Sequence, residues 1–105
     1  MRELKSLKKL NELLESSGNK LVVIDFYADW CGPCRIMAPK FEQLDSEFLD
    51  VIFAKVNIEK SSKDISNQYA ISSIPHFKFF KYKTEVDNVK GANETSLKEK
   101  IEKWH

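Results

Sequence analysis

One run of residues, from Leu21 to Ala28, constrains the fold more than any other part of the 105-residue chain. It reads LVVIDFYA, and every position except Asp25 is aliphatic or aromatic. A run rich in β-branched and aromatic residues, without alternation of polar positions, is typical of a strand that is covered on both faces. Helices must then pack on each side of the sheet that contains this strand, so the run indicates an α/β architecture.

Helical and strand patterns alternate along the rest of the chain. The expected strands are an edge strand at Arg2–Ser6, the strand at Leu21–Ala28, a strand at Val51–Val56, a strand at His76–Phe80 and its hairpin partner at Thr84–Lys90. Between the first two strands we expect a helix that ends at Gly18, with Leu7, Leu10 and Leu14 on one face, and after the second strand a helix that buries Met37, Phe41, Leu44 and Phe48. A short helix is expected at Asp64–Tyr69, and a last helix, capped by Asn93, should bury Leu97, Ile101 and Trp104. This order predicts an α/β sandwich with a partly parallel central sheet. The length predicts a single domain over residues 1–105.

The charge balance excludes several classes of function. The chain has 17 Lys and Arg residues against 16 Asp and Glu, without a polybasic cluster. Binding to nucleic acid or to an anionic membrane surface is therefore not expected. No stretch approaches the roughly 20 apolar residues that span a bilayer. The N-terminal region, Met1 to Lys20, lacks the apolar core of a secretory signal, so we expect a cytoplasmic, reducing environment.

The only two cysteines, Cys31 and Cys34, stand between the apolar strand and the amphipathic helix that follows it. A disulfide between two cysteines this close would close a loop too short to stabilise a fold, so their spacing indicates chemistry at one place. Pro33 suits the first turn of a helix, which puts Cys31 at the helix N-terminus, where free N–H groups and the helix dipole favour a thiolate. A lowered thiol pKa alone speeds attack only a few-fold, so we also expect a docking surface beside Cys31.

Two alternatives remain for the cysteine pair. A structural zinc site needs four ligands, and the remaining candidates are His76, beside a proline, and His105, the last residue. Two inert buried thiols are the other alternative, which fits poorly with Gly-Pro at the start of a helix.

Asp25 is the one charged residue in the apolar run. A buried carboxylate without a charged partner has a raised pKa, so Asp25 is a candidate base for Cys34 near neutral pH. The alternative is a carboxylate at the end of the strand that faces solvent.

These residues resemble the thioredoxin family. The match extends over essentially the whole chain and is carried by VVIDFYADWCGPCRIMAP from Val22 to Pro39, the Ile74-Pro75 step, the strand from Phe77 to Lys81, and the turn Gly91-Ala92-Asn93. The start of the chain and the strand VIFAKVNIE look closest to eukaryotic cytosolic members. The resemblance implies a central mixed sheet of about five strands flanked by four helices. It also implies a protein-disulfide oxidoreductase in which Cys31 is the exposed nucleophile and Cys34 resolves the mixed disulfide.

The resemblance assigns roles to further residues. Asp25 would be the base for Cys34, and Lys55 would pair with Asp25, the alternative being a solvated strand lysine. Pro75 would follow a cis peptide bond, the alternative being an ordinary trans proline at the start of a strand. Gly32 and Pro33 would tune the redox pair. The docking patch for target proteins would be Trp30, Gly32, Pro33, Ile74, Pro75, Gly91 and Ala92, and for Trp30 the alternative is core packing.

The resemblance also implies partners. The chain itself would bind no cofactor, since NADPH would act through a thioredoxin reductase that recharges the cysteine pair. Targets would be disulfide-containing proteins such as peroxiredoxins or ribonucleotide reductase. The chain would act as a monomer that carries electrons in cell redox homeostasis.

The sequence departs from the family pattern at four places. His76 stands where the family usually has Thr, and its imidazole would either tune the cysteine pair or point away into the sheet. Ser73 replaces a Gly, and Tyr27 replaces a frequent Trp or Phe. The hairpin has Lys81-Tyr82-Lys83 in place of Asn-Gly, so it needs a non-glycine residue at positive φ or a longer turn. Three interpretations therefore remain open: a reductase, an oxidase or isomerase with the same chemistry, and a binding module that uses the same fold.

Overall fold

The computed structural model describes residues 1–105 as five strands and four helices in one sheet-centred structure. The elements are β1 (Arg2–Glu3), α1 (Leu7–Ser16), β2 (Val22–Tyr27), α2 (Gly32–Glu47), β3 (Ile52–Asn57), α3 (Lys63–Tyr69), β4 (His76–Lys81), β5 (Thr84–Lys90) and α4 (Glu94–Trp104). Every element expected from the sequence is present, in the expected order.

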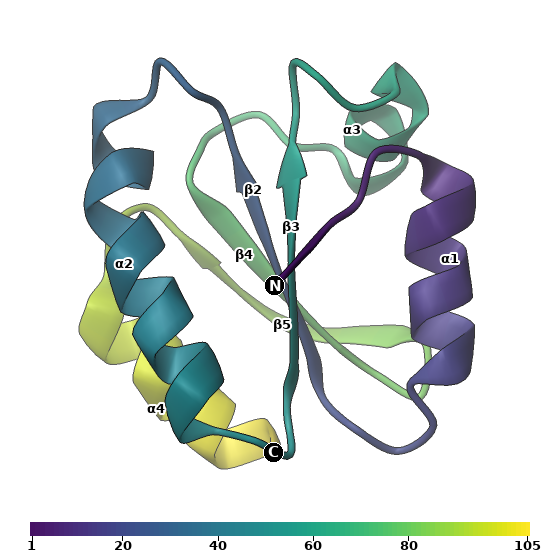
Figure 1. Ribbon diagram of the computed structural model, residues 1–105, viewed down its shortest axis with the longest axis vertical. Coiled ribbons are helices and arrows are strands. Elements are labelled where there is room, and N and C mark those ends of the chain that lie inside the picture. Colours follow the sequence, from purple (N-terminus) through teal and green to yellow (C-terminus); the bar gives the residue numbers. More distant parts are fainter.

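The sheet is mixed, with strand order β1-β3-β2-β4-β5. β1, β3 and β2 run parallel, whereas β4 is antiparallel to β2 and β5 is antiparallel to β4. Helices α2 and α4 cover one face of the sheet, and α1 and α3 cover the other (Figure 1). The predicted α/β class and mixed sheet are confirmed.

Strand β2 alternates between two apolar clusters, which explains why its sequence shows no polar face. Val23 packs with side chains of α2 and α4, including Met37 and Ile101. Ile24 and Phe26 pack with α1 and α3 on the opposite face. Asp25 follows the alternation onto the face of α2, where its register partner on β4 is Phe77, a member of the first cluster. The buried strand therefore aims one carboxylate at α2.

The ends of several elements differ from the sequence-based expectation because polar side chains cap the helices. The Ser6 hydroxyl accepts a hydrogen bond from the backbone N–H of Lys9 at 3.2 Å, so the first strand ends at Glu3 and not at Ser6. At the other end of the chain the Asn93 side chain caps α4, as predicted, through the N–H of Ser96 at 2.9 Å. Phe48 is the C-cap of α2 and lies just outside the helix.

The hairpin between β4 and β5 turns on two residues at positive φ. Tyr82 has φ 53° and Lys83 has φ 66°, in the left-handed region that two-residue hairpins require. The expectation of non-glycine residues at positive φ is confirmed.

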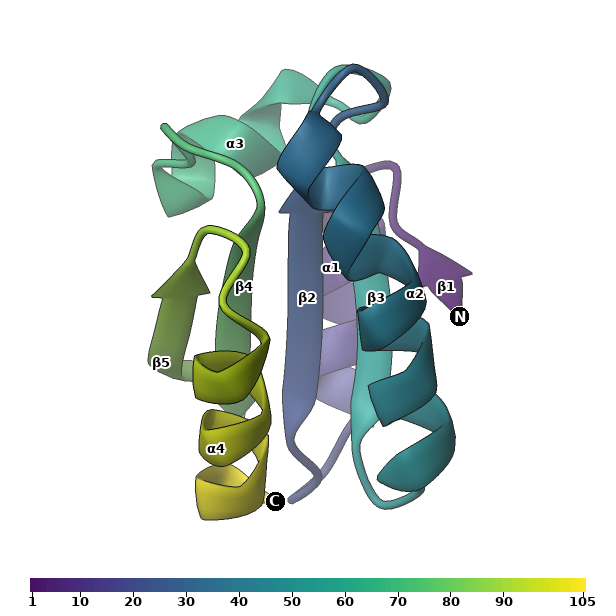
Figure 2. The ribbon, with the colours of Figure 1, turned by 90° about the vertical axis from the view of Figure 1, so that its left-hand side faces the viewer.

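The carboxyl ends of β2 and β3 lie at one edge of the sheet, and α2 begins there (Figure 2). The loop between β2 and α2 carries the cysteine pair, so the fold brings the pair to this edge. None of the helices is both long enough and apolar enough to cross a membrane.

Candidate redox site

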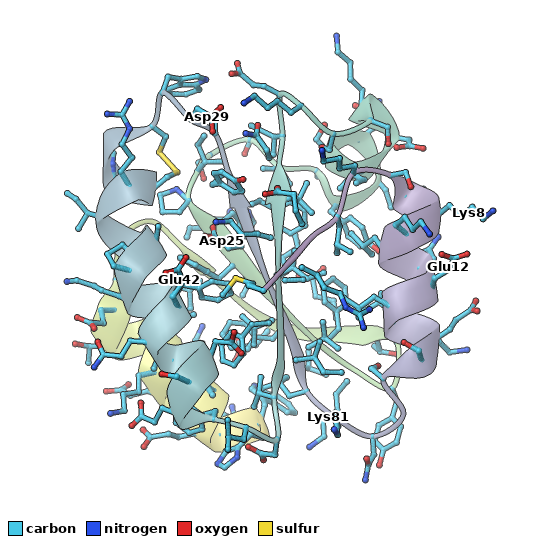
Figure 3. The ribbon with its side chains drawn as sticks, viewed as in Figure 1. Lys8, Glu12, Asp25, Asp29, Glu42 and Lys81 are labelled. Carbon is cyan, nitrogen blue, oxygen red and sulfur yellow. A yellow bond between two sulfur atoms is a disulfide. The ribbon has the colours of Figure 1, made fainter.

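Cys31 and Cys34 form a disulfide across the first turn of α2, with their Cα atoms 5.2 Å apart. Cys31 is the N-cap of the helix, and its Sγ accepts a hydrogen bond from the backbone N–H of Cys34 at 3.2 Å. Pro33 lies in the first turn, where a missing N–H breaks no hydrogen bond of the helix. Figure 3 shows the sulfur–sulfur bond at the beginning of α2. The predicted position of the pair at a helix N-terminus is confirmed.

The expectation that Cys31 is the exposed member of the pair is wrong for this oxidised structure. Both cysteines are 3% exposed. The disulfide holds the Cys31 sulfur in a small cluster with Ala28 and Cys34, against which Tyr27, Ile58 and Ile74 pack. The cluster is separate from the two large ones, and Trp30 beside it is 62% exposed. Trp30 therefore forms part of the exposed surface next to the buried pair.

The Ile74–Pro75 peptide bond is cis, as the resemblance implied. Ile74 packs against the cysteine cluster, and the backbone N–H of Gly91 donates to the carbonyl of Pro75 at 2.8 Å. The structure thus brings Ile74 to the cysteines and the turn at Gly91 and Ala92 to Pro75. Trp30, Gly32, Pro33 and Ala92 are exposed, Ile74 and Gly91 are half-buried, and Pro75 is buried.

Asp25 is buried, and its Oδ1 atom has no hydrogen-bond partner. Burial raises the pKa of Asp25 to about 7 from an ordinary value of 3.8, with a smaller contribution from Glu3, while the charge of Lys55 opposes the increase. Asp25 and Cys34 line the same cleft of about 270 Å³ between α2 and the sheet. Figure 3 shows Asp25 on the side of the sheet that faces α2. A carboxyl group that titrates near neutral pH therefore faces the same space as the second cysteine.

Lys55 also lines this cleft and is the register partner of Asp25 on β3. No ion pair joins the two, however. The Lys55 ammonium lies over the ring of Tyr27, 4.9 Å from its centroid, in a cation–π contact. Lys55 thus acts on Asp25 through its charge across the cleft and not through a direct contact.

The local sequence did not reveal three contacts at this edge of the sheet. The Tyr27 hydroxyl donates to both carboxylate oxygens of Glu3, at 2.7 and 3.0 Å. The backbone N–H of Asn57 donates to the same carboxylate at 3.2 Å. Ile58 packs against the cysteine cluster. Glu3 reaches the site only because β1 pairs with β3, a contact between distant segments that no local pattern predicts.

His76 does not face the cysteine pair. Its register partner on β2 is Phe26, so it lies on the face of α1 and α3, opposite to Asp25. It is buried, neither ring nitrogen has a hydrogen-bond partner, and burial lowers its pKa. Of the two alternatives for His76, the structure shows the one in which it points into the sheet.

His105 binds the Asp50 carboxylate at 2.7 Å and packs on Phe48, at the end of α2 that is remote from Cys31. The two histidines considered as zinc ligands are therefore not brought to the cysteines. No three side chains of His, Cys, Asp or Glu lie together in a metal-binding arrangement.

Comparisons with known proteins agree with this geometry. The family model described as "Thioredoxin" matches residues 4–103. A thioredoxin from Geodia cydonium is 46% identical over 101 residues, which is 95% of this chain and 94% of that protein. The X-ray structure of Fasciola hepatica thioredoxin has a TM-score of 0.97 and 41% identity, with full coverage of both chains.

A longer protein is similar as well. A peptide-N(4)-(N-acetyl-beta-glucosaminyl)asparagine amidase from Caenorhabditis briggsae is 48% identical over 106 residues. The match covers 100% of this chain but only 17% of the amidase.

The fold, the family match and the relatives support one assignment. The chain has the fold of a solved thioredoxin and carries a disulfide across the first turn of α2. The chain belongs to the thioredoxin family.

Proposed function

We propose that this chain reduces disulfide bonds in other proteins and carries electrons between them through Cys31 and Cys34. One observation carries the proposal: the disulfide spans the start of α2, and Cys34 shares a cleft with the unpartnered carboxyl group of Asp25. The site thus holds a nucleophile, a resolving thiol and a proton acceptor.

The reaction starts from the dithiol form. The Cys31 thiolate attacks one sulfur of the target disulfide, a bond forms between Cys31 and that sulfur, and the other target sulfur leaves as a thiolate. Asp25 accepts the proton of Cys34, and the Cys34 thiolate attacks the Cys31 sulfur. The bond between Cys31 and the target sulfur breaks, that sulfur leaves as a thiolate, and the chain is left with the disulfide of this structure. Two electrons have passed to the target, and its two thiolates take up one proton from protonated Asp25 and one from the solvent, which received the Cys31 proton when the Cys31 thiolate formed.

The backbone beside the cysteines supports docking of an extended peptide. The N–H and C=O groups of Ile74 take part in no backbone hydrogen bond, and Ile74 packs against the cysteine cluster. A target segment can pair with these groups as an added strand, which holds its disulfide near Cys31. Trp30, exposed beside the pair, offers apolar contact to the same segment.

The oxidised pair must be reduced again, and we propose that a thioredoxin reductase does this with electrons from NADPH, while the chain itself binds no cofactor. A thioredoxin f2 in a complex with ferredoxin: thioredoxin reductase is 30% identical, with a TM-score of 0.92. A second solved chain belongs to a structure on the thiol resolving mechanism of a yeast mitochondrial 1-Cys peroxiredoxin via glutathione/thioredoxin systems. That chain is 32% identical to this one. Peroxiredoxins are accordingly the first targets to test, followed by ribonucleotide reductase. The proposed setting is the cytoplasm, and the proposed state is a monomer.

The direct test is reduction of insulin with NADPH and a thioredoxin reductase. The wild-type chain should precipitate insulin and consume NADPH, whereas Cys31→Ser should do neither. Cys34→Ser should form the mixed disulfide once and retain it, since the resolving thiol is missing. An inactive wild-type chain, or equal activity of Cys31→Ser, would contradict the proposal.

A binding module is the second candidate, because a chain 48% identical to this one forms 17% of an amidase. In that role the chain would hold a partner without exchanging electrons. A double Cys31→Ser, Cys34→Ser variant that still supports its partner would favour the module, whereas loss of partner function favours the reductase.

A further inference from the structure

Three charged residues stand in one row across three strands. Glu3 on β1 is in register with Lys55 on β3, and Lys55 is in register with Asp25 on β2. Side chains in register across neighbouring strands share one face of the sheet. One cation therefore stands between two carboxyl groups, and the two compete for it.

Neither carboxyl group forms an ion pair with Lys55. Glu3 is occupied by the Tyr27 hydroxyl, which donates to both of its oxygens, and by the backbone N–H of Asn57. Lys55 lies over the Tyr27 ring. Burial and the bond to Glu3 raise the pKa of Tyr27, so its hydroxyl keeps its proton and remains a donor. Tyr27 thus holds Glu3 with its hydroxyl and Lys55 with its ring.

The other charged groups around the cleft are already engaged. Arg35, at the start of α2, donates from Nε to the carbonyl of Asp29 at 3.0 Å. The Asp29 carboxylate binds Lys60 at 2.7 Å and the Asn57 side chain at 3.1 Å. The neighbour of Asp25 on β4 is Phe77, which is apolar. Lys55 is therefore the cation whose position decides the field at Asp25.

We propose that Tyr27 and Glu3 are positioning residues of the redox site: their hydrogen bond keeps Glu3 from capturing Lys55, so that the Lys55 charge stays at the cleft that Asp25 and Cys34 share. The role of this field in the reaction rests on the proposed function, in which Asp25 takes the proton of Cys34. The geometry itself does not depend on it.

Two substitutions should shift the pKa of Asp25 in opposite directions. Tyr27→Phe keeps the ring but removes the donor to Glu3, which frees Glu3 to pair with Lys55 and draws the cation from Asp25. The pKa of Asp25 should then rise. Glu3→Gln removes the competitor and a negative charge two strands, or roughly 10 Å, from Asp25. The pKa of Asp25 should fall, by about half a unit at an effective dielectric constant between those of protein and water.

The measurement is the titration of the Asp25 side-chain carboxyl carbon by NMR in the oxidised protein, where the cysteines do not titrate. Lys55→Gln gives the reference for loss of the cation and should itself raise the pKa of Asp25. In that background Tyr27→Phe should add no further increase, because there is no cation left to move. Tyr82→Phe, in the exposed hairpin turn, and Glu15→Gln, at an exposed position of α1, are the matched controls and should leave the titration unchanged.

A titration of Asp25 that is the same in wild type, Tyr27→Phe and Glu3→Gln would overturn the proposal. So would a Tyr27→Phe shift that persists in full in the Lys55→Gln background, since the tyrosine would then act without the cation. Both outcomes concern only the carboxyl group and are independent of insulin reduction. If Tyr27→Phe raises and Glu3→Gln lowers the pKa of Asp25 but the wild-type chain reduces no insulin, the positioning role stands and the proposed function is refuted.

Discussion

Two buried charged side chains on neighbouring strands are treated in opposite ways by this fold. Lys78 on β4 is buried, and its ammonium binds both oxygens of Glu85 at 2.9 and 3.1 Å. Asp25 on β2 is also buried, yet its Oδ1 has no partner and no cation contacts the carboxyl group. Lys78 is in register with Ile24 on the face of α1 and α3, while Asp25 faces α2 and Cys34.

The difference separates a charge that stabilises the fold from a group that can take part in the reaction. The buried ammonium of Lys78 has a bonded partner, and the ion pair joins β4 to β5. A buried carboxyl group without a partner exchanges its proton near neutral pH, at a cost in stability. Asp25 is the one buried carboxyl group of the fold, and it lies beside the redox pair.

The largest expected effect is on the pH dependence of stability. The pKa of Asp25 is raised from 3.8 to about 7 in the folded chain, so the folded state holds a proton that the unfolded state has lost. The stabilisation from this proton is full below pH 4 and disappears as the pH rises through 7. Integrated over that interval, it amounts to about 4 kcal/mol.

Asp25→Asn does not titrate and supplies the comparison. Chemical denaturation at pH 4 and at pH 8 measures the free energy of unfolding of oxidised wild type and of Asp25→Asn. The difference between the two proteins should change by about 4 kcal/mol, because wild type becomes less stable relative to Asp25→Asn at pH 8. A constant difference across this range would place Asp25 in the same class as Lys78.

The second prediction concerns the rate of the resolving step. Asp25→Asn should slow release of the target from the mixed disulfide by about 100-fold at pH 7, a typical contribution of a positioned base. Stopped-flow mixing of the dithiol form with a disulfide peptide measures it. The formation of the mixed disulfide at Cys31 serves as the internal control and should change much less. Equal slowing of both steps would argue against a specific role at Cys34.

The third prediction sharpens the comparison from the side of β4. Glu85→Ala leaves the buried ammonium of Lys78 without its partner and should cost about 2 kcal/mol of unfolding free energy, below the usual range for buried pairs because Glu85 is partly exposed. Denaturation at constant pH measures the loss. Insulin reduction by the folded variant and its pH profile should stay as in wild type. A changed pH profile would show that the two charges are coupled and would break the comparison.

The smallest effect is expected at the exposed edge of the redox site. Trp30→Ala should weaken productive docking of a protein target by about tenfold, or ~1.4 kcal/mol. Stability should hardly change, because Trp30 is 62% exposed. The dependence of the reduction rate on insulin concentration measures docking, and thermal unfolding measures stability. Destabilisation in place of weaker docking would assign Trp30 to the core.

The sequence predicted most of the fold because its elements are encoded locally. The run at β2 predicted a doubly covered strand, and the apolar spacing from Met37 to Leu44 predicted the buried face of α2. The Cys31 N-cap followed from the residues that flank it. The end of the first strand was misplaced because Ser6 serves as a helix cap, which a strand pattern does not reveal.

The site was less predictable, because its field comes from segments that are distant in sequence. Glu3 and Lys55 are 52 positions apart in numbering and meet only through the pairing of β1 with β3. The contact of Lys55 with the Tyr27 ring, in place of an ion pair with Asp25, joins β3 to β2, two strands that are also distant in sequence. The near-equal burial of the two cysteines follows from the disulfide, a covalent state that the sequence does not specify.

The most direct measurement is the titration of the Asp25 carboxyl group in the oxidised wild-type chain, followed by carbon NMR between pH 3 and pH 9. The unpartnered, buried carboxyl group should titrate at about 7. A midpoint near the ordinary value of 3.8 would mean that Asp25 is ionised throughout the physiological range. It could then be a weak base at most, and the proton transfer from Cys34 would need another acceptor.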